Sequence, residues 1–200
     1  FPLLRDYGEA YLDNAATAQR PQCVLDAICD FYCNSNANPM RGFYPLSLAA
    51  TDAYENSRAR VARFIGATNP SEVIFTRNAS ESLNLVAYTY GLSTLKAGDE
   101  VAVSILEHHS NLLPWQMVCK KTGATLRFLD CEPDGSFSEQ TLDEGINEKT
   151  KLIEIQRSKG YASRPTLSAE QIGELIAFVK SIKPEVICMV DNCYGEFVER

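Results

Sequence analysis

The sequence has little positive charge and no long apolar run. Its 200 residues include 19 Lys and Arg against 26 Asp and Glu, which gives a formal net charge of −7. This balance argues against the basic face that nucleic acids and anionic membranes require. No apolar run approaches the roughly 20 residues that span a bilayer, and no secretory signal peptide is visible. We therefore expect neither nucleic acid nor membrane as a partner.

Motifs for metals and nucleotides are also scarce. Cys29 and Cys33 are four residues apart on a predicted helix, but no paired CxxC or HxxxH follows them. We therefore expect no metal site and interpret these cysteines as buried small apolar side chains. The pattern GxxxxGK[ST] is missing, so a nucleotide P-loop is not expected.

Cysteine usage indicates the compartment. The chain has seven cysteines, an odd number. Without a signal peptide, this predicts free thiols in a reducing cytoplasm.

Strand-like and helix-like segments alternate along the chain, with short links and no internal repeat. The predicted strands cover residues 10–14, 72–76, 100–106, 125–130, 151–156 and 185–191. The predicted helices begin at Pro21 and otherwise cover residues 47–67, 78–91, 111–123, 138–147 and 168–184. Ser47 and Ser168 are expected to cap helix starts, and Gly66 to end a helix. Because the interior strands are nearly continuous apolar runs, we predict an α/β fold whose mostly parallel sheet has helices on both faces.

Ligands of such sheets bind at the carboxyl ends of the strands, so the residues that follow each strand are the candidates for function. After "EVIFT" comes "RNASES", where the backbone N–H of Ala79 and the hydroxyl of Ser80 at a helix start can bind phosphate. The alternative, favoured on this stretch alone, is that Asn78 or Ser80 only caps the helix.

Two further strand ends carry polar residues. After "EVAVSIL" come His108 and His109, and an imidazole there can stack on an aromatic ligand and move protons. Adjacent side chains diverge, so we expect at most one to face the site; the alternative is an exposed polar loop. After "EVICMV" comes Asp191, whose burial requires a partner such as a protonated pyridine nitrogen. The alternative is a helix cap or a structural salt bridge.

Together, a phosphate cup, a stacking ring and a carboxylate for a ring nitrogen describe a pocket for pyridoxal 5′-phosphate. Five ordered stretches agree with this prediction: "YLDNAATAQRP", "NPMRGFYPLSLAATDAYENSRARVARFIGA", "EVIFTRNASESLNLVAYTYG", "AGDEVAVSILEHHSNLLPWQ" and "EKTKL". Over residues 11–152 they resemble the cysteine desulfurases of the class V aminotransferase group, fold type I, and most closely the Suf-type, selenocysteine lyase-like branch.

This resemblance implies a three-layer α/β/α fold, pyridoxal 5′-phosphate as cofactor and L-cysteine as substrate, converted to alanine with transfer of its sulfur. It also implies a homodimer and a sulfur acceptor protein. It places Ala79 and Ser80 at the phosphate and makes His108 a catalytic residue that stacks on the ring. Asn14, with Ala15 and Ala16, would lie near the substrate, and Arg41 at the mouth of the active site.

The resemblance changes at about residue 153. The strings "IQRSKGY" and "VDNCYGEF" are similar to the methionine gamma-lyase-like proteins often labelled aluminium resistance proteins. The chain thus resembles a splice of two relatives joined near residues 151–155. Both families place an Asp for the ring nitrogen at the end of this strand, so either resemblance implies this role for Asp191. Tyr194 stands where a Gln is usual.

The resemblance also implies what this chain does not hold. No lysine here matches the Schiff-base motif, and that lysine, the nucleophilic cysteine and the small domain are expected beyond Arg200. We expect residues 1–20 to form an N-terminal segment and residues 21–200 part of the cofactor-binding large domain. The isolated chain is expected to be inactive. Two alternatives stay open: a lyase that cleaves C–S bonds by elimination, and a non-catalytic fragment.

Overall fold

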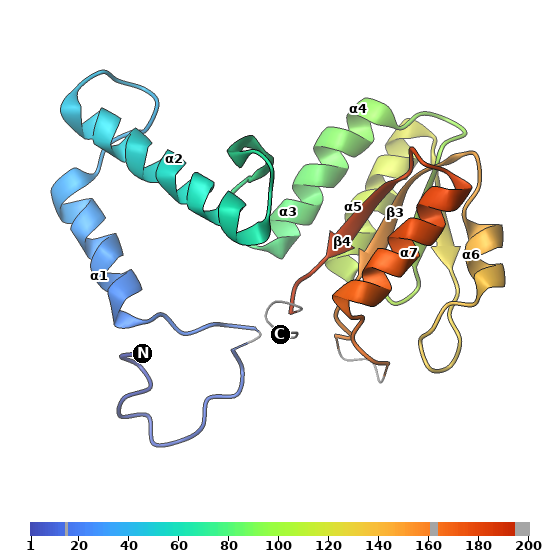
Figure 1. The fold of residues 1–200 in the computed structure, drawn as a ribbon, viewed down its shortest axis with the longest axis horizontal. Coiled ribbons are helices and arrows are strands. Elements are labelled where there is room, and N and C mark those ends of the chain that lie inside the picture. Colours follow the sequence, from blue (N-terminus) through green and yellow to red (C-terminus); the bar gives the residue numbers. More distant parts are fainter. Residues whose placement is uncertain (15, 161–163, 195–200) are drawn as a thin grey trace. The chain divides into compact units, whose positions relative to one another are not determined.

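The computed structural model describes residues 1–14, 16–160 and 164–194, which divide into two compact units (Figure 1). The first unit covers Phe1–Phe75 and the second begins at Thr76. The sheet and the candidate site both belong to the second unit. Within the described part of the chain, no helix is long and apolar enough to cross a membrane.

The first unit is mostly helical. Its elements are α1 (Gln22–Asp30), the π-helix η1 (Phe31–Ser35), α2 (Pro45–Ile65) and the 3-10 helix η2 (Pro70–Glu72). Helix α2 ends as predicted at Gly66, whose φ of 71° is the left-handed conformation that glycine adopts without strain. It begins at Pro45 and not after Ser47 as predicted, because proline suits the first helical position. Ser47 is instead buried inside the helix and donates a hydrogen bond to the carbonyl oxygen of Asn38.

The two strands predicted in this part of the chain are not formed. Residues 10–13 and 73–76 have no ladder partner among the described residues, and a strand exists only when its backbone pairs with another. Thr17 N donates to Asp13 O instead and closes a turn. The carbonyl oxygen of Val73 accepts a hydrogen bond from the guanidinium of Arg58.

None of the seven cysteines forms a disulfide within the described part of the chain. The predicted burial of Cys29 and Cys33 is wrong, because both are exposed, as is Cys23. The reason is that α1 and η1 bury none of their residues within the first unit.

The second unit alternates helices and strands as predicted. Its elements in chain order are α3 (Ala79–Val86), η3 (Ala87–Gly91), α4 (Leu92–Thr94), β1 (Glu100–Ser104), α5 (His109–Thr122), β2 (Thr125–Leu129), α6 (Glu139–Gly145), β3 (Thr150–Gln156), α7 (Ala169–Ile182) and β4 (Ile187–Asp191). The strands form a parallel sheet in the order β2-β1-β3-β4. The prediction of a parallel α/β sheet is therefore confirmed.

Two apolar cores cover the two faces of this sheet, because successive residues of a strand point to opposite faces. Val101 and Val103 of β1 belong to the core that includes Trp115 of α5. Ala102 belongs to the other core, with Val179 of α7. Helices α5 and α7 accordingly lie on opposite sides of the sheet (Figure 1). This is the predicted three-layer α/β/α arrangement.

Polar contacts fix the ends of these elements. The guanidinium of Arg127 in β2 donates two hydrogen bonds, of 2.7 and 2.9 Å, to the buried carboxylate of Glu100. These bonds, together with one from Asn147, hold the pKa of Glu100 below its ordinary value. Ser168 caps α7 as predicted, in a capping box with Gln171.

Candidate cofactor site

A cleft opens in the second unit between the start of α3 and the end of β4. It is lined by Thr76, Asn78, Ala79, Ser82, Leu83 and Val86 on one side and by Met189, Val190, Asp191, Asn192 and Cys193 on the other. Its volume of about 550 Å³ is within the range of small-molecule sites. Because β4 is parallel to its neighbours, the cleft lies at the carboxyl edge of the sheet, where ligands of this fold class bind.

The start of α3 borders this cleft, which Asn78 and Ala79 line. Asn78 is the N-cap, and its side-chain oxygen accepts a 2.9 Å hydrogen bond from Glu81 N. The hydroxyls of Thr76 and Ser82 lie 2.6 Å apart and brace the turn. The N–H groups of Ala79 and Ser80 belong to the first turn, where helix geometry supplies no acceptor. Asn78 therefore caps the helix, as the alternative interpretation held. This cap leaves the backbone N–H groups of Ala79 and Ser80 available to an anion.

Asp191 lies on the opposite wall of the cleft, at the last position of β4. Only 8% of its surface is exposed. One carboxylate oxygen accepts a 3.0 Å hydrogen bond from Cys193 N. No salt bridge to Asp191 is present within the described residues. A buried carboxylate in this situation favours a cationic or hydrogen-bond-donating ligand.

His108 is the N-cap of α5, at the carboxyl end of β1 but outside the residues that line the cleft. Its Nδ1 accepts a 3.2 Å hydrogen bond from Ser110 N and lies 2.7 Å from Ser110 Oγ. Nδ1 therefore acts as an acceptor, so the neutral ring carries its proton on Nε2. The prediction that the rings of His108 and His109 diverge is wrong, because their centroids are 4.0 Å apart. The start of α5 turns the backbone between them and brings both rings to one side.

Glu107 connects the loop after β1 to the end of β3. Its Oε1 accepts hydrogen bonds from Ser104 Oγ at 2.9 Å and from Gln156 N at 3.1 Å. Its Oε2 accepts a 2.8 Å hydrogen bond from Asn111 Nδ2. Burial raises the pKa of Glu107 in spite of these three donors, and the charge of Asp191 adds to the effect.

Glu154, near the end of β3, is a second buried acid of this cluster. Only 2% of its surface is exposed. Its Oε2 accepts a 3.2 Å hydrogen bond from Asn111 Nδ2, which also donates to Glu107. Burial, with the charges of Glu107 and Asp191, raises the pKa of Glu154 to about 8. Among the described residues, Asn111 Oδ1 and Glu154 Oε1 have no hydrogen-bond partner. A proton on Glu154 supplies a donor to this acceptor-rich cluster at neutral pH.

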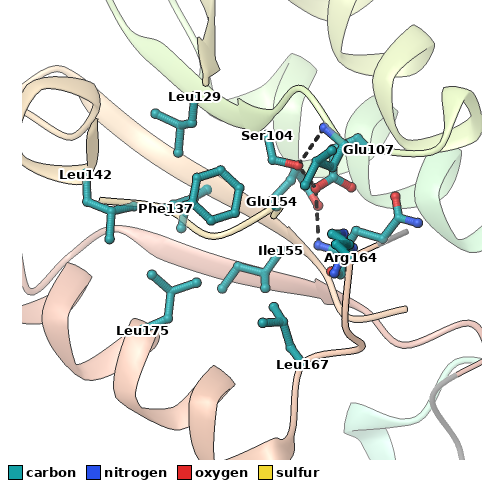
Figure 2. Close-up of a pocket in the computed structure, with 14 residues that line it drawn as sticks. Ser104, Glu107, Leu129, Phe137, Leu142, Glu154, Ile155, Arg164, Leu167 and Leu175 are labelled. Atoms are coloured by element: carbon teal, nitrogen blue, oxygen red, sulfur yellow. Dashed lines mark hydrogen bonds between the residues drawn. The ribbon is translucent and has the colours of Figure 1, made fainter. Parts of the chain in front are cut away.

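Glu107 and Glu154 also line a second, much smaller cavity of about 30 Å³ (Figure 2). Phe137, Leu142 and Leu175 form its apolar end, and Glu107 and Arg164 its polar end. The guanidinium of Arg164 donates hydrogen bonds to the carbonyl oxygens of Gln156, Ser158 and Pro165. A space of this size accommodates one or two water molecules rather than an organic ligand.

The predicted site residues fall into three groups. Ala79 and Asp191 line the same cleft; Ser80 follows Ala79 but is exposed and does not line it. His108 lies at the same edge of the sheet. Asn14, Ala16 and Arg41 belong to the first unit, and Ala15 lies outside the described residues.

Sequence reasoning missed several residues of this edge. Thr76 and Ser82 brace the helix start, and Cys193 lines the cleft. Gln156 is the last residue of β3. Residues at the carboxyl ends of parallel strands are candidates for ligand binding, so the criterion that selected Asp191 also selects Gln156.

The residues of the cleft fit pyridoxal 5′-phosphate. A helix start with available N–H groups suits the phosphate, and a buried carboxylate without a salt bridge suits the protonated ring nitrogen. Both features border one cleft. This combination is typical of a class of protein, the α/β proteins that bind pyridoxal phosphate at the carboxyl edge of a parallel sheet.

Comparison with known proteins gives the family. The model of the family described as Aminotransferase class-V matches residues 10–192, and the chain belongs to this family, whose members depend on pyridoxal 5′-phosphate. A protein of Synechocystis sp. named as a probable cysteine desulfurase is 49% identical over 159 residues, which are 78% of this chain and 38% of that protein.

Solved structures agree with this assignment. The cysteine desulfurase CsdA from Escherichia coli superposes with a TM-score of 0.76 at 32% identity, over 98% of this chain and 47% of that one. A Listeria innocua protein described as a cystathionine beta-lyase involved in aluminium resistance superposes with a TM-score of 0.54 at 28% identity, over 88% of this chain and 44% of that one. The chain therefore spans less than half the length of these proteins.

Proposed function

We propose that this chain is the cofactor-binding part of a cysteine desulfurase. Such an enzyme converts L-cysteine to L-alanine and passes the sulfur to a thiol, which becomes a persulfide. Pyridoxal phosphate, when bound, supplies an electron sink for this chemistry. The observation that carries the proposal is that the α3 start and Asp191 face one cleft of a chain so similar to cysteine desulfurases.

Four residues at this edge of the sheet have proposed tasks. The N–H groups of Ala79 and Ser80 and the Ser80 hydroxyl bind the phosphate. Asp191 holds a proton on the ring nitrogen, because its buried carboxylate is stabilised by the positive charge. His108, whose Nδ1 is engaged by Ser110, offers Nε2 to move a proton and its ring face to stack on the cofactor.

Further proposals concern parts of the enzyme outside this cleft. Asn14, Ala16 and Arg41 bind the substrate, as the resemblance to the desulfurases implies. The complete protein is proposed to be a cytoplasmic homodimer that delivers sulfur to an acceptor protein.

The proposal is tested by titrating the chain with pyridoxal phosphate, with the visible circular dichroism of the bound cofactor as readout. Asp191→Asn is expected to weaken binding about 10- to 100-fold, the usual loss for a hydrogen bond to a charged group. The matched control is Asp130→Asn, because Asp130 also follows a strand of this sheet and accepts a backbone N–H, that of Cys131. Equal affinities for the native chain and both variants would refute the site.

A second candidate function is C–S bond cleavage by elimination, which converts L-cysteine and water to pyruvate, ammonia and hydrogen sulfide. It is favoured by the string "IQRSKGY", which resembles the methionine gamma-lyase-like proteins, and by the likeness to the Listeria innocua protein described as a cystathionine beta-lyase. Product analysis of the complete enzyme separates the two functions. Alanine with a persulfide supports the desulfurase, whereas pyruvate with sulfide supports the lyase.

A further inference from the structure

Gln156 is a neighbour of both the histidine and the acid of the proposed site. Its Oε1 accepts a hydrogen bond from the backbone N–H of His108. In the register of β3 and β4, its partner is Asp191. Register partners of a sheet point to the same face, so Gln156 and Asp191 are side-by-side neighbours on the sheet.

Gln156 is itself held firmly. Its own N–H donates to Glu107 Oε1, and its Nε2 donates to the carbonyl oxygen of Ser158 at 3.3 Å. Only 9% of its surface is exposed. Glu107 is fixed in turn by Ser104 and Asn111, so the glutamine amide has little freedom.

These hydrogen bonds connect the segment after β1 and the end of β3 in both directions. Glu107 and His108 follow β1, whereas Gln156 ends β3, and each of the two segments donates one backbone N–H to a side chain of the other. Such reciprocal bonds fix the His108 backbone relative to the end of β3, and the pairing of β3 with β4 relates that end to Asp191. Truncation of a buried acceptor leaves the N–H of His108 without its partner, which is costly away from water.

We propose that Gln156 is a positioning residue, which sets the ring of His108 relative to the carboxylate of Asp191 so that both address the same bound cofactor. This inference rests on the proposed function of the cleft, because it assumes a cofactor at Asp191. Glu107 orients Gln156 in this arrangement. Gln156 touches neither substrate nor cofactor and acts through His108.

The first experiment measures hydrogen exchange of the His108 amide in the chain without cofactor. Gln156→Met keeps the length of the side chain but removes its acceptor, and should speed exchange of this amide about two- to tenfold relative to the Val118 amide inside α5. Gln156→Glu keeps an acceptor oxygen at the same reach and should restore the protection. The exposed Gln140, changed to Met, is the matched control and should have no effect.

The second experiment measures the visible circular dichroism of pyridoxal phosphate at saturation. This signal reports the asymmetric surroundings of the ring, so a displaced His108 changes it even when affinity is kept. Gln156→Met should lose most of the band while its dissociation constant changes by less than about threefold, because the phosphate and ring-nitrogen contacts remain. Gln156→Glu should recover the band. If Gln156→Met does not fold, Gln156→Asn, which keeps the amide but is too short, should show the same loss.

The outcomes distinguish failure of the proposed function from failure of the positioning role of Gln156. If the native chain gives no cofactor band, or one that Asp191→Asn leaves unchanged, the proposed function fails and the positioning role falls with it. If the native band depends on Asp191 but persists in Gln156→Met, only the positioning role is overturned. Unchanged exchange of the His108 amide in Gln156→Met overturns it as well.

Discussion

Replacement of Glu154 by Gln should make the protein more stable at neutral pH. Burial raises the pKa of this carboxyl from 4.5 to about 8, so the folded protein keeps a proton there that the unfolded chain releases. Because the folded state binds more protons between these values, the stability contributed by Glu154 is complete below pH 4.5 and is lost as the pH rises towards 8.

The size of the effect follows from the two pKa values. Each pH unit above 4.5 costs about 1.4 kcal/mol until the pH approaches the folded-state pKa, which amounts to ~3 kcal/mol at pH 7 and ~4 kcal/mol at pH 8. Glutamine has the shape of the protonated acid and cannot ionise. The difference in unfolding free energy between Glu154→Gln and the native chain should therefore be small near pH 4.5 and grow to ~3 kcal/mol at pH 7.

The assay is urea unfolding followed by the fluorescence of Trp115, the only tryptophan, which is fully buried in the same unit. Glu174→Gln on the exposed surface of α7 is the control and should show no such growth. A constant difference between Glu154→Gln and the native chain from pH 4.5 to 8 would refute the reasoning. It would mean that Glu154 is ionised in the folded state and that its neighbours compensate for the charge.

Three further changes probe the fold of the two units. Arg127→Met removes the two guanidinium hydrogen bonds to Glu100 and should cost about 1 to 2 kcal/mol at pH 7, because Arg127 is partly exposed and Asn147 still donates to Glu100. Because the pKa of Glu100 is lowered, this loss should shrink as the pH falls below 4.5, and urea unfolding at pH 3 and pH 7 measures both values. Ser168→Ala removes the cap of α7 and should cost about 1 kcal/mol in the same assay, and an unchanged midpoint would show that the capping box contributes nothing. Gly66→Ala forces a positive φ on a residue with a side chain and should lower the free energy of unfolding by about 1 kcal/mol. Backbone strain alone would cause this loss, because the added Cβ would meet no atom within 4 Å. An unchanged midpoint of thermal unfolding would show that this strain is absent.

The sheet could be predicted from sequence because each of its strands is a short apolar run between helix signals. Pattern alone does not reveal whether a strand has a partner, and residues 72–76 are apolar enough to be a strand but pair with nothing in the described chain. Helix ends were predictable where local chemistry decides them, as at Gly66 and Ser168. Ser47 misled because a proline two residues earlier is the better helix start.

The cleft was predictable in part for a similar reason. Asp191 and Ala79 stand at ends of elements, where position in the chain indicates position on the sheet edge. The pairing of Glu107 with Gln156, and of Glu154 with Asn111, joins residues more than 40 positions apart. A local sequence pattern does not indicate partners so far apart in the chain. The hydrogen bonds of Glu107 and Gln156 around His108 could therefore be identified only from the three-dimensional structure.

The central claim is that the carboxylate of Asp191 receives the ring nitrogen of pyridoxal phosphate. The most direct measurement is the ¹⁵N chemical shift of cofactor labelled at that nitrogen and bound to the chain, between pH 6 and 8. We expect a protonated nitrogen throughout this range in the native chain and loss of the proton in Asp191→Asn, while Asp130→Asn behaves as the native chain. A nitrogen that titrates as in free cofactor, or identically in all three proteins, would contradict it.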